Sequence, residues 1–202
     1  MKVQVLYSGG KDSSLSAILL EPFFEVELVT CTFGLSDSWE NAREAAREIG
    51  FPFRLVTLDP KIIDESIEIM LQYGYPRYGI DHVHKGALET VARLGEAKFI
   101  ADGTRRDDKS PMLNFSEIRS LEDRLGVRYV RPLAGYGRHA IDDLLKEHLE
   151  IVEDDTERVE KADYECEIRS AVRNKLGEET YRKIFPPKHA QSRVLRRYKL
   201  CR

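Results

Sequence analysis

Seven consecutive residues near the N-terminus are rich in the residue types that form phosphate sites, which are glycine, serine and lysine. Residues 8–14 read Ser-Gly-Gly-Lys-Asp-Ser-Ser, and they lie between an apolar run that ends at Tyr7 and another that begins at Leu15. This order predicts a strand, a tight loop and a helix. Two adjacent glycines permit positive φ and close approach of a ligand, and a helix N-terminus offers free N–H groups and the positive end of its dipole. The sequence therefore predicts a phosphate site at the start of this helix.

The polar side chains of this loop indicate a metal-bound phosphate. Ser8, Ser13 and Ser14 add hydroxyl donors, and Lys11 adds a positive charge. Asp12 would repel phosphate unless a cation lay between them, so we interpret it as a contact to Mg²⁺. The loop differs from the common G-x-x-x-x-G-K-[ST] phosphate loop, because an aspartate follows the lysine.

The loop does resemble the SGGxDS loop of the N-type ATP pyrophosphatases, the PP-loop or adenine nucleotide α-hydrolase-like superfamily. A chance serine–glycine turn that caps a helix is the alternative. The resemblance implies that ATP places its β and γ phosphates in the loop, with Lys11 and Asp12 as catalytic groups. An acceptor then attacks the α-phosphorus, pyrophosphate leaves, and a second nucleophile displaces AMP. The residues implied to bind ATP here are Ser8, Gly9, Gly10, Lys11, Asp12, Ser13 and Ser14.

A second polar loop follows the predicted strand from Lys98 to Asp102. Residues 103–109 read Gly-Thr-Arg-Arg-Asp-Asp-Lys, and the ends of parallel strands would bring them beside the first loop. They resemble the G-T-x-x-D element of GMP synthetase and the tRNA thiolation enzymes. That resemblance implies that Asp107 or Asp108 contacts Mg²⁺ or the activated substrate. It also implies that Asp107 is a catalytic group. A solvated charged loop is the alternative. The residues implied to bind the nucleotide here are Gly103, Thr104 and Arg105.

Three further features follow predicted strands or helices. In the superfamily the end of the second strand receives adenine, which implies that Phe33 stacks on the base; for Cys31 we favour core packing. For Arg138, in the loop after the fifth strand, the sequence leaves two alternatives, a ligand contact and a surface position.

His82 and His84 are two residues apart and would point in different directions on a helix, so we expect no metal site there. Asp81 is interpreted as a helix cap.

The elements that position these residues alternate along the chain. Strands are predicted at residues 2–7, 24–33, 53–58, 98–102 and 127–130, with helices between them. Such alternation predicts parallel strands with right-handed crossovers. The resemblance implies an α/β Rossmann-like sandwich of the HUP type with a mostly parallel five-stranded sheet. We expect an ATP-binding core at residues 1–149 and a helical C-terminal extension at residues 150–202.

Composition excludes several classes of protein. The chain has 202 residues and a net charge of −3; no apolar stretch is long enough to span a bilayer, and no signal peptide precedes the first strand. Cys31, Cys166 and Cys201 form neither a disulfide framework nor a C-x-x-C pair. We therefore expect a cytoplasmic protein.

The charges at the C-terminal end are strongly segregated. Residues 150–167 hold nine acidic side chains, whereas residues 188–202 hold six Lys or Arg and no acid. The basic segment would either bind RNA phosphates or complement the acidic one.

The resemblance leaves the acceptor open. The chain lacks the C-x-x-C pairs of iron–sulfur thiolation enzymes and also lacks a glutaminase domain. We therefore expect a ligase or amidating enzyme that uses ATP, Mg²⁺ and a nucleophile such as ammonia. The alternatives are a tRNA-modifying enzyme, of the thiolation or lysidine type, and a non-catalytic ATP- or AMP-binding module. Whether the chain forms a homo-oligomer is also open.

Overall fold

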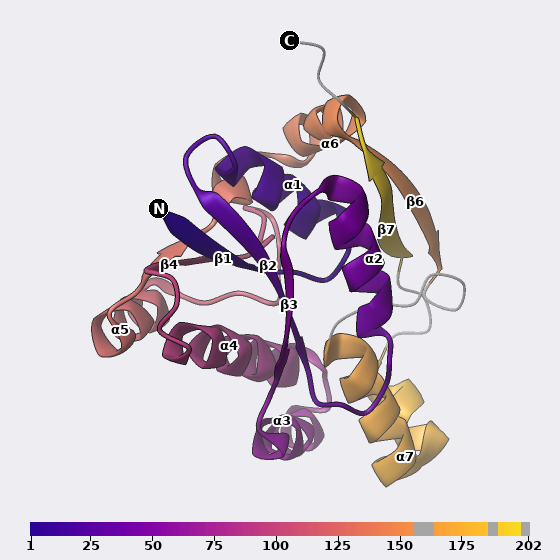
Figure 1. Cartoon of the computed structure of the whole chain (residues 1–202). Coiled ribbons are helices and arrows are strands. Elements are labelled where there is room, and N and C mark those ends of the chain that lie inside the picture. The colour runs from indigo at the N-terminus through magenta and orange to yellow at the C-terminus, as the bar shows by residue number, and fades with distance from the viewer. Residues whose placement is uncertain (156–163, 186–189, 199–202) are drawn as a thin grey trace.

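Five parallel strands form the central sheet of the computed structural model, which describes residues 1–155, 164–185 and 190–198. The strand order is β3-β2-β1-β4-β5 (Figure 1). The chain leaves β1 toward β2 and later returns to its other side at β4, so the order reverses between β1 and β4. In open α/β sheets, ligands bind at the carboxyl ends of the strands at such a point. The strands are β1 Lys2–Leu6, β2 Glu25–Thr32, β3 Phe53–Thr57, β4 Phe99–Ala101 and β5 Arg128–Val130.

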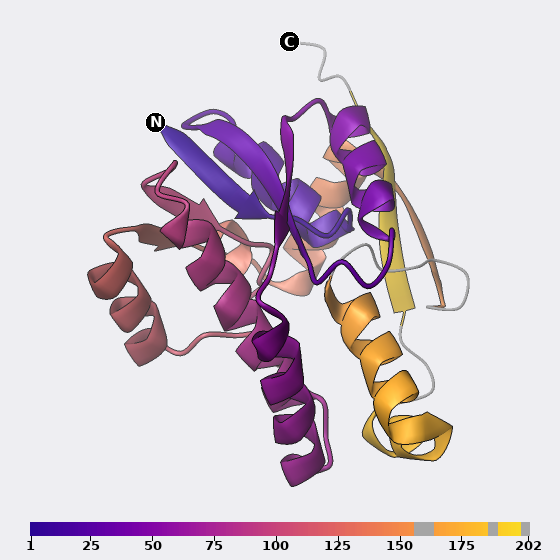
Figure 2. The ribbon, with the colours of Figure 1, turned by 60° about the horizontal axis from the view of Figure 1, so that its bottom comes forward.

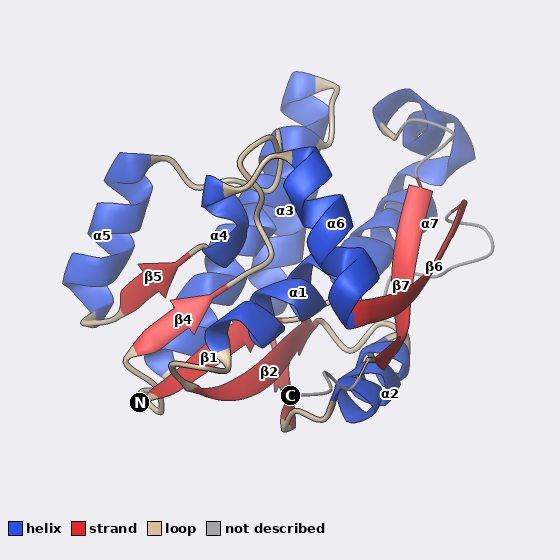
Figure 3. Cartoon of the chain, turned by 90° about the horizontal axis from the view of Figure 1, so that it is seen from above, coloured by secondary structure: helices blue, strands red, loops and turns tan. Residues whose placement is uncertain are grey.

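Helices cover both faces of this sheet, as Figure 3 shows from above. Alternate residues of a strand point to opposite faces. Val3 and Val5 of β1 pack in one core with α1, α2 and α6, and Leu6 packs in the other with α3, α4, α5 and α7. The expected α/β sandwich is confirmed. The helices are α1 Lys11–Leu20, α2 Trp39–Ile49, α3 Pro60–Tyr73, α4 Arg77–Arg93, α5 Phe115–Leu125, the 3-10 helix η1 Pro132–Gly135, α6 Arg138–His148 and α7 Tyr164–Ile184.

Helix α4 begins earlier than the sequence pattern predicts. Gly74 ends α3 in the left-handed conformation, with φ of 65°, and Pro76 is already the N-cap of α4. Asp81 is therefore inside the helix, where it accepts hydrogen bonds from Ser110 Oγ and from the amide of Met112. Its interpretation as a helix cap is wrong. The helix pair α3–α4 and helix α7 project from the same end of the molecule (Figure 2).

The C-terminal extension is only partly helical. Strand β6, Leu149–Asp155, pairs antiparallel with β7, Ala190–Arg197, in a two-stranded ribbon beside α2 and α6. Opposite charges meet across the ribbon, where Arg196 Nε lies 2.5 Å from Glu150 Oε2. Cross-strand pairs of this kind stabilise a sheet, which is why segments that we expected to be helical form strands. Part of the basic segment thus complements the acidic one; residues 186–189 and 199–202 lie outside the described residues.

Candidate functional site

The predicted loop joins β1 to α1 and has the geometry of a phosphate cradle. Gly9 has φ of 72°, and a Cβ there would lie 3.1 Å from Ala42 Cα, so the position requires glycine. Gly10 is the N-cap of α1 without any side-chain cap hydrogen bond. Ser8 Oγ accepts from the amide of Gly10 at 3.4 Å, and Ser13 Oγ donates to the Gly10 carbonyl at 3.3 Å. These two hydrogen bonds connect Ser8 and Ser13 to Gly10 at the start of α1.

This loop lines a cavity of about 470 Å³ at the carboxyl ends of β1 and β4. The volume is in the range of small-molecule sites. Residues 8–13, 103–105 and 108 all contribute to its wall. Ser14 does not, because its buried hydroxyl donates to Tyr7 Oη at 3.1 Å. The structure therefore brings together most of the residues that were expected to bind a nucleotide.

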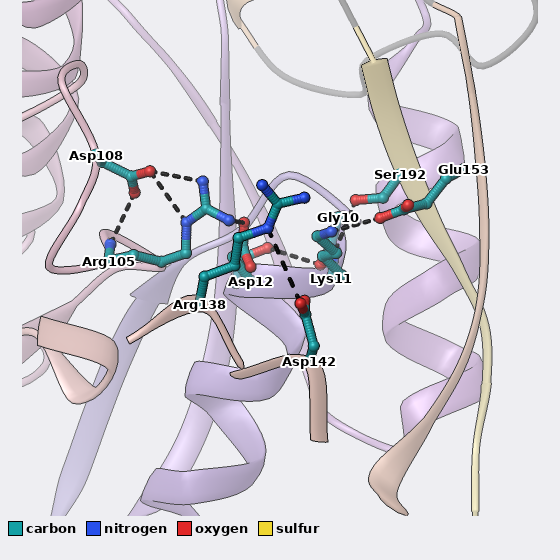
Figure 4. A network of polar contacts seen from close by, with 10 residues as sticks. Gly10, Lys11, Asp12, Arg105, Asp108, Arg138, Asp142, Glu153 and Ser192 are labelled. Carbon is teal, nitrogen blue, oxygen red and sulfur yellow. Dashed lines mark hydrogen bonds and ion pairs between the residues drawn. The ribbon is translucent and has the colours of Figure 1, made fainter. Parts of the chain in front are cut away.

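The two predicted loops are in direct contact through Gly103. A Cβ on Gly103 would lie 2.6 Å from the amide nitrogen of Ser13, so only glycine allows this approach. The contact places Arg105 Nη1 3.7 Å from Asp12 Oδ2. The Arg105 guanidinium also donates two hydrogen bonds to Asp108 Oδ1, at 2.7 and 3.0 Å (Figure 4). Arginine and two carboxylates thus surround the start of α1.

Asp12 carries the feature that fits a bound cation. Its Oδ1 is buried without a hydrogen-bond partner. Burial raises the pKa of Asp12, against the lowering effect of Arg105 and Lys11. A buried carboxylate oxygen without a donor is costly, and a cation would satisfy it. No group of three acidic, histidine or cysteine side chains could hold a metal within residues 1–155, 164–185 and 190–198. A Mg²⁺ at Asp12 would therefore take phosphate and water as its other ligands, as this ion commonly does.

The other two carboxylates predicted to act with Asp12 are placed differently. Asp108 lines the cavity, and its side chain is held by Arg105. The side chain of Asp107 is 58% exposed, bonds to Arg106 and does not line the cavity. Of these two, Asp108 is therefore the better placed to meet a ligand.

The β6–β7 ribbon reaches the loop, a contact that the sequence analysis missed. Lys11 Nζ forms an ion pair with Glu153 of β6. The amide of Lys11 donates to Ser192 Oγ at 3.3 Å (Figure 4). The amide of Val194 donates to the Gly9 carbonyl at 3.1 Å. These partners are far apart in the chain, and no local pattern could have indicated them. The C-terminal extension is therefore part of the site.

The end of β2 is not open to a base. Phe33 is 7% exposed, packs in the core and does not line the cavity. Its amide donates to Glu167 Oε2 at 2.7 Å, and the Leu35 amide donates to Glu167 Oε1 at 2.8 Å. Glu167, from α7, also accepts a hydrogen bond from Thr32 Oγ1 at 2.9 Å. The expectation that Phe33 stacks on adenine is therefore not met in this structure, whereas Cys31 does line the cavity.

A buried polar cluster forms the wall of the cavity between α4 and β4. His84 Nε2 lies 2.8 Å from Asp102 Oδ2, and His84 Nδ1 lies 2.8 Å from Tyr164 Oη. His84 and Asp102 are 4% and 2% exposed. The sequence analysis correctly separated His84 from His82, which bonds to Glu65, but it gave His84 no role.

Arg138 unites the two alternatives that the sequence left open. Its side chain is 82% exposed and lies 3.9 Å from Asp142, yet it contributes to the rim of the cavity.

Among the described residues, no helix is both long and apolar enough to cross a membrane.

Comparison with known proteins identifies relatives along nearly the whole chain. "Uncharacterized protein MJ0690" of Methanocaldococcus jannaschii is 40% identical over 196 residues, which is 96% of each chain. A crystal structure described as the "predicted subunit of tRNA methyltransferase" from the same organism has a TM-score of 0.87 and 40% identity, and covers 98% of each chain.

A more distant similarity is to the U34-tRNA thiolase NcsA from Methanococcus maripaludis, with a TM-score of 0.48 and 14% identity over 91% of this chain and 70% of that chain. A similarity of this size indicates nothing about activity. A family model matches residues 1–196. The chain therefore belongs to DUF7411, a family of unknown function.

Proposed function

We propose that this protein is an ATP pyrophosphatase that adenylates a tRNA and then exchanges AMP for a second nucleophile. The observation that carries the proposal is the start of α1, where the helix N-terminus, Lys11 and the partnerless Asp12 Oδ1 share one cavity. An oxygen of the acceptor would attack the α-phosphorus of ATP, and pyrophosphate would leave with the bonding electron pair. This chemistry needs an electropositive cradle for the leaving group more than it needs acid–base residues.

The chain's own residues suit that task. The terminal phosphates would replace the Ser8 and Ser192 hydroxyls as acceptors for the Gly10 and Lys11 amides. The Lys11 and Arg105 side chains would stabilise the charge that develops on pyrophosphate. Asp12 would hold Mg²⁺, which neutralises phosphate charge and aligns the leaving group, and Asp108 would keep the Arg105 guanidinium beside Asp12. Gly103 would keep the Arg105 loop against α1, so that both sets of groups face the same phosphates.

The choice of tRNA as acceptor reverses the order in which the sequence ranked the acceptors. The 40% identical structure from M. jannaschii is described as a tRNA methyltransferase subunit, which supports an RNA substrate for this chain. Arg138 and Arg193 also line the cavity and would bind RNA phosphates. A ligase that transfers ammonia to another acceptor would share the adenylation step, but its ATP cleavage would not depend on tRNA.

The test is ATP turnover with Mg²⁺, with and without unfractionated archaeal tRNA. We expect AMP formation that increases with tRNA and collapses in Asp12→Asn, while ATP still binds to this variant. Asp107→Asn is the matched control, because this neighbouring carboxylate lies outside the cavity wall. Equal turnover in Asp12→Asn and the parent would refute the role of Asp12, and turnover indifferent to tRNA would refute the acceptor.

A nucleotide-binding module without turnover is the second candidate. Two observations favour it: Glu153 forms an ion pair with Lys11, and Glu167 accepts hydrogen bonds from the amides at the end of β2. A sensor of this kind would bind ATP or AMP and release neither AMP nor pyrophosphate from ATP under any acceptor condition. The turnover assay therefore separates the two candidates.

A further inference from the structure

The cluster of His84, Asp102 and Tyr164 has no role in the adenylation step. Asp102 follows β4, His84 is on α4, and Tyr164 begins α7. All three line the cavity, although each is less than a tenth exposed. The next residue after Asp102 is Gly103, which contacts the first turn of α1. The cluster is thus in the same cavity as the phosphate loop, on a wall that the loop does not form.

Hydrogen bonds fix where the protons lie. Burial by itself would raise the pKa of Asp102, but the hydrogen bonds that it accepts, first among them the one from His84, lower it. An ionised Asp102 can only accept, so His84 Nε2 carries a proton. The Thr104 amide donates to Asp102 Oδ1 at 2.9 Å, and Tyr129 Oη donates to Oδ2 at 2.5 Å. In the neutral ring His84 Nδ1 is then an acceptor, and the Tyr164 hydroxyl at 2.8 Å donates to it.

We propose that Tyr164 and His84 form a proton relay that activates the second nucleophile, with Asp102 positioning the imidazole. The relay rests on the proposed function, because it acts on the adenylated acceptor. A proton-bearing nucleophile of the amine or thiol class donates a hydrogen bond to Tyr164 Oη. As it attacks the carbon that bears the AMP oxygen, its proton moves to Tyr164, and the Tyr164 proton moves to His84 Nδ1. The carbon–oxygen bond breaks, and AMP leaves with the electron pair.

The surroundings of His84 suit a proton acceptor. The imidazolium formed in this step would be held by ionised Asp102, in the arrangement that stabilises a protonated base. The other titratable groups near the ring are Asp81 on the same helix and Tyr129 behind Asp102. Cys31 lines the same cavity. Burial raises the pKa of Tyr129 beyond its usual range, so Tyr129 keeps its proton. The proton released by the nucleophile therefore has one acceptor in the relay, His84.

The two half-reactions can be separated in a rapid-mixing experiment. The protein, ATP, Mg²⁺ and unfractionated archaeal tRNA are mixed with ammonium or sulfide, and pyrophosphate and AMP are measured separately over a range of pH. We expect His84→Gln and Tyr164→Phe to keep the pyrophosphate burst and to release AMP about 100-fold more slowly. His82→Gln, on the exposed face of the same helix, is the matched control and should behave as the parent.

The outcomes distinguish the relay from the proposed function. Unchanged AMP release in His84→Gln and Tyr164→Phe would overturn the relay and leave adenylation intact. Absence of any pyrophosphate formation by the parent would overturn the proposed function. Nitrogen NMR of His84 tests the relay independently of turnover: we expect a neutral ring protonated on Nε2, with a changed Nδ1 signal in Tyr164→Phe. A ring protonated only on Nδ1 would overturn the relay.

Discussion

Replacing Glu153 by glutamine should strengthen the binding of pyrophosphate or ATP. In this structure Glu153 forms an ion pair with Lys11, the side chain that we assign to the phosphates. An incoming phosphate must therefore displace the carboxylate. Glutamine keeps the shape of the side chain and removes the charge, so Lys11 would be available without that competition.

The magnitude follows from the exposure of the two partners. The Lys11 side chain is 20% exposed and that of Glu153 is 51% exposed, so solvent screens the pair. Partly exposed pairs contribute about 0.2–1 kcal/mol, which corresponds to an affinity gain of up to about fivefold. The gain should shrink as salt concentration rises, because salt screens the pair that is being removed.

Isothermal titration calorimetry with pyrophosphate and Mg²⁺ measures this gain. Glu150→Gln is the matched control, since Glu150 is on the same strand but pairs with Arg196. That variant should bind pyrophosphate as the parent does. Equal or weaker binding by Glu153→Gln would refute the reasoning, because it would mean that Lys11 does not bind the phosphates or that Glu153 assists them.

Three further changes test other parts of the site. Glu167→Ala leaves three donors at the end of β2 without their acceptor, so it should lower the free energy of unfolding, measured by urea denaturation, by about 3 kcal/mol. Glu179→Ala, on the exposed part of α7, should leave that free energy unchanged, and equal stability of the two variants would contradict the contact. Gly103→Ala would put a Cβ 2.6 Å from the Ser13 amide, so it should cost about 1–3 kcal/mol and abolish pyrophosphate binding; a fully binding variant would show that the two loops need not touch. Burial raises the pKa of Asp12, and protonation of Asp12 removes the cation's ligand, so Mg²⁺-dependent ATP binding should weaken on acidification at a pH above the ordinary Asp value near 3.9. Asp12→Asn should lose this pH dependence, and binding by the parent that does not change with pH would refute the role of Asp12.

Local patterns predicted the loop between β1 and α1 and the parallel sheet. The sequence of residues 8–14 determines its own conformation, since glycines, hydroxyls and a helix start follow one another within a few residues. The alternation of strands and helices then places Gly103 beside that loop, because parallel strands end at one edge. Both inferences depend on short-range order, which single sequences show well.

The contacts made by the C-terminal residues could not be predicted in this way. Ser192 and Glu153 reach Lys11 from 181 and 142 positions away, and Glu167 reaches Phe33 from 134 positions away. Residues 149–155 read Leu-Glu-Ile-Val-Glu-Asp-Asp, which does not alternate between apolar and polar residues and so did not indicate a strand. His84 resembles any other polar residue of an amphipathic helix until the fold places Asp102 opposite it. Such pairs are determined by tertiary packing alone.

The central claim is that ATP is cleaved between its α and β phosphates in the cavity at the start of α1. The most direct measurement is separation of the labelled products of ATP after incubation with the protein, Mg²⁺ and archaeal tRNA. We expect AMP and pyrophosphate from the parent protein, and neither product above background from Asp12→Asn. Formation of ADP and phosphate instead would contradict it.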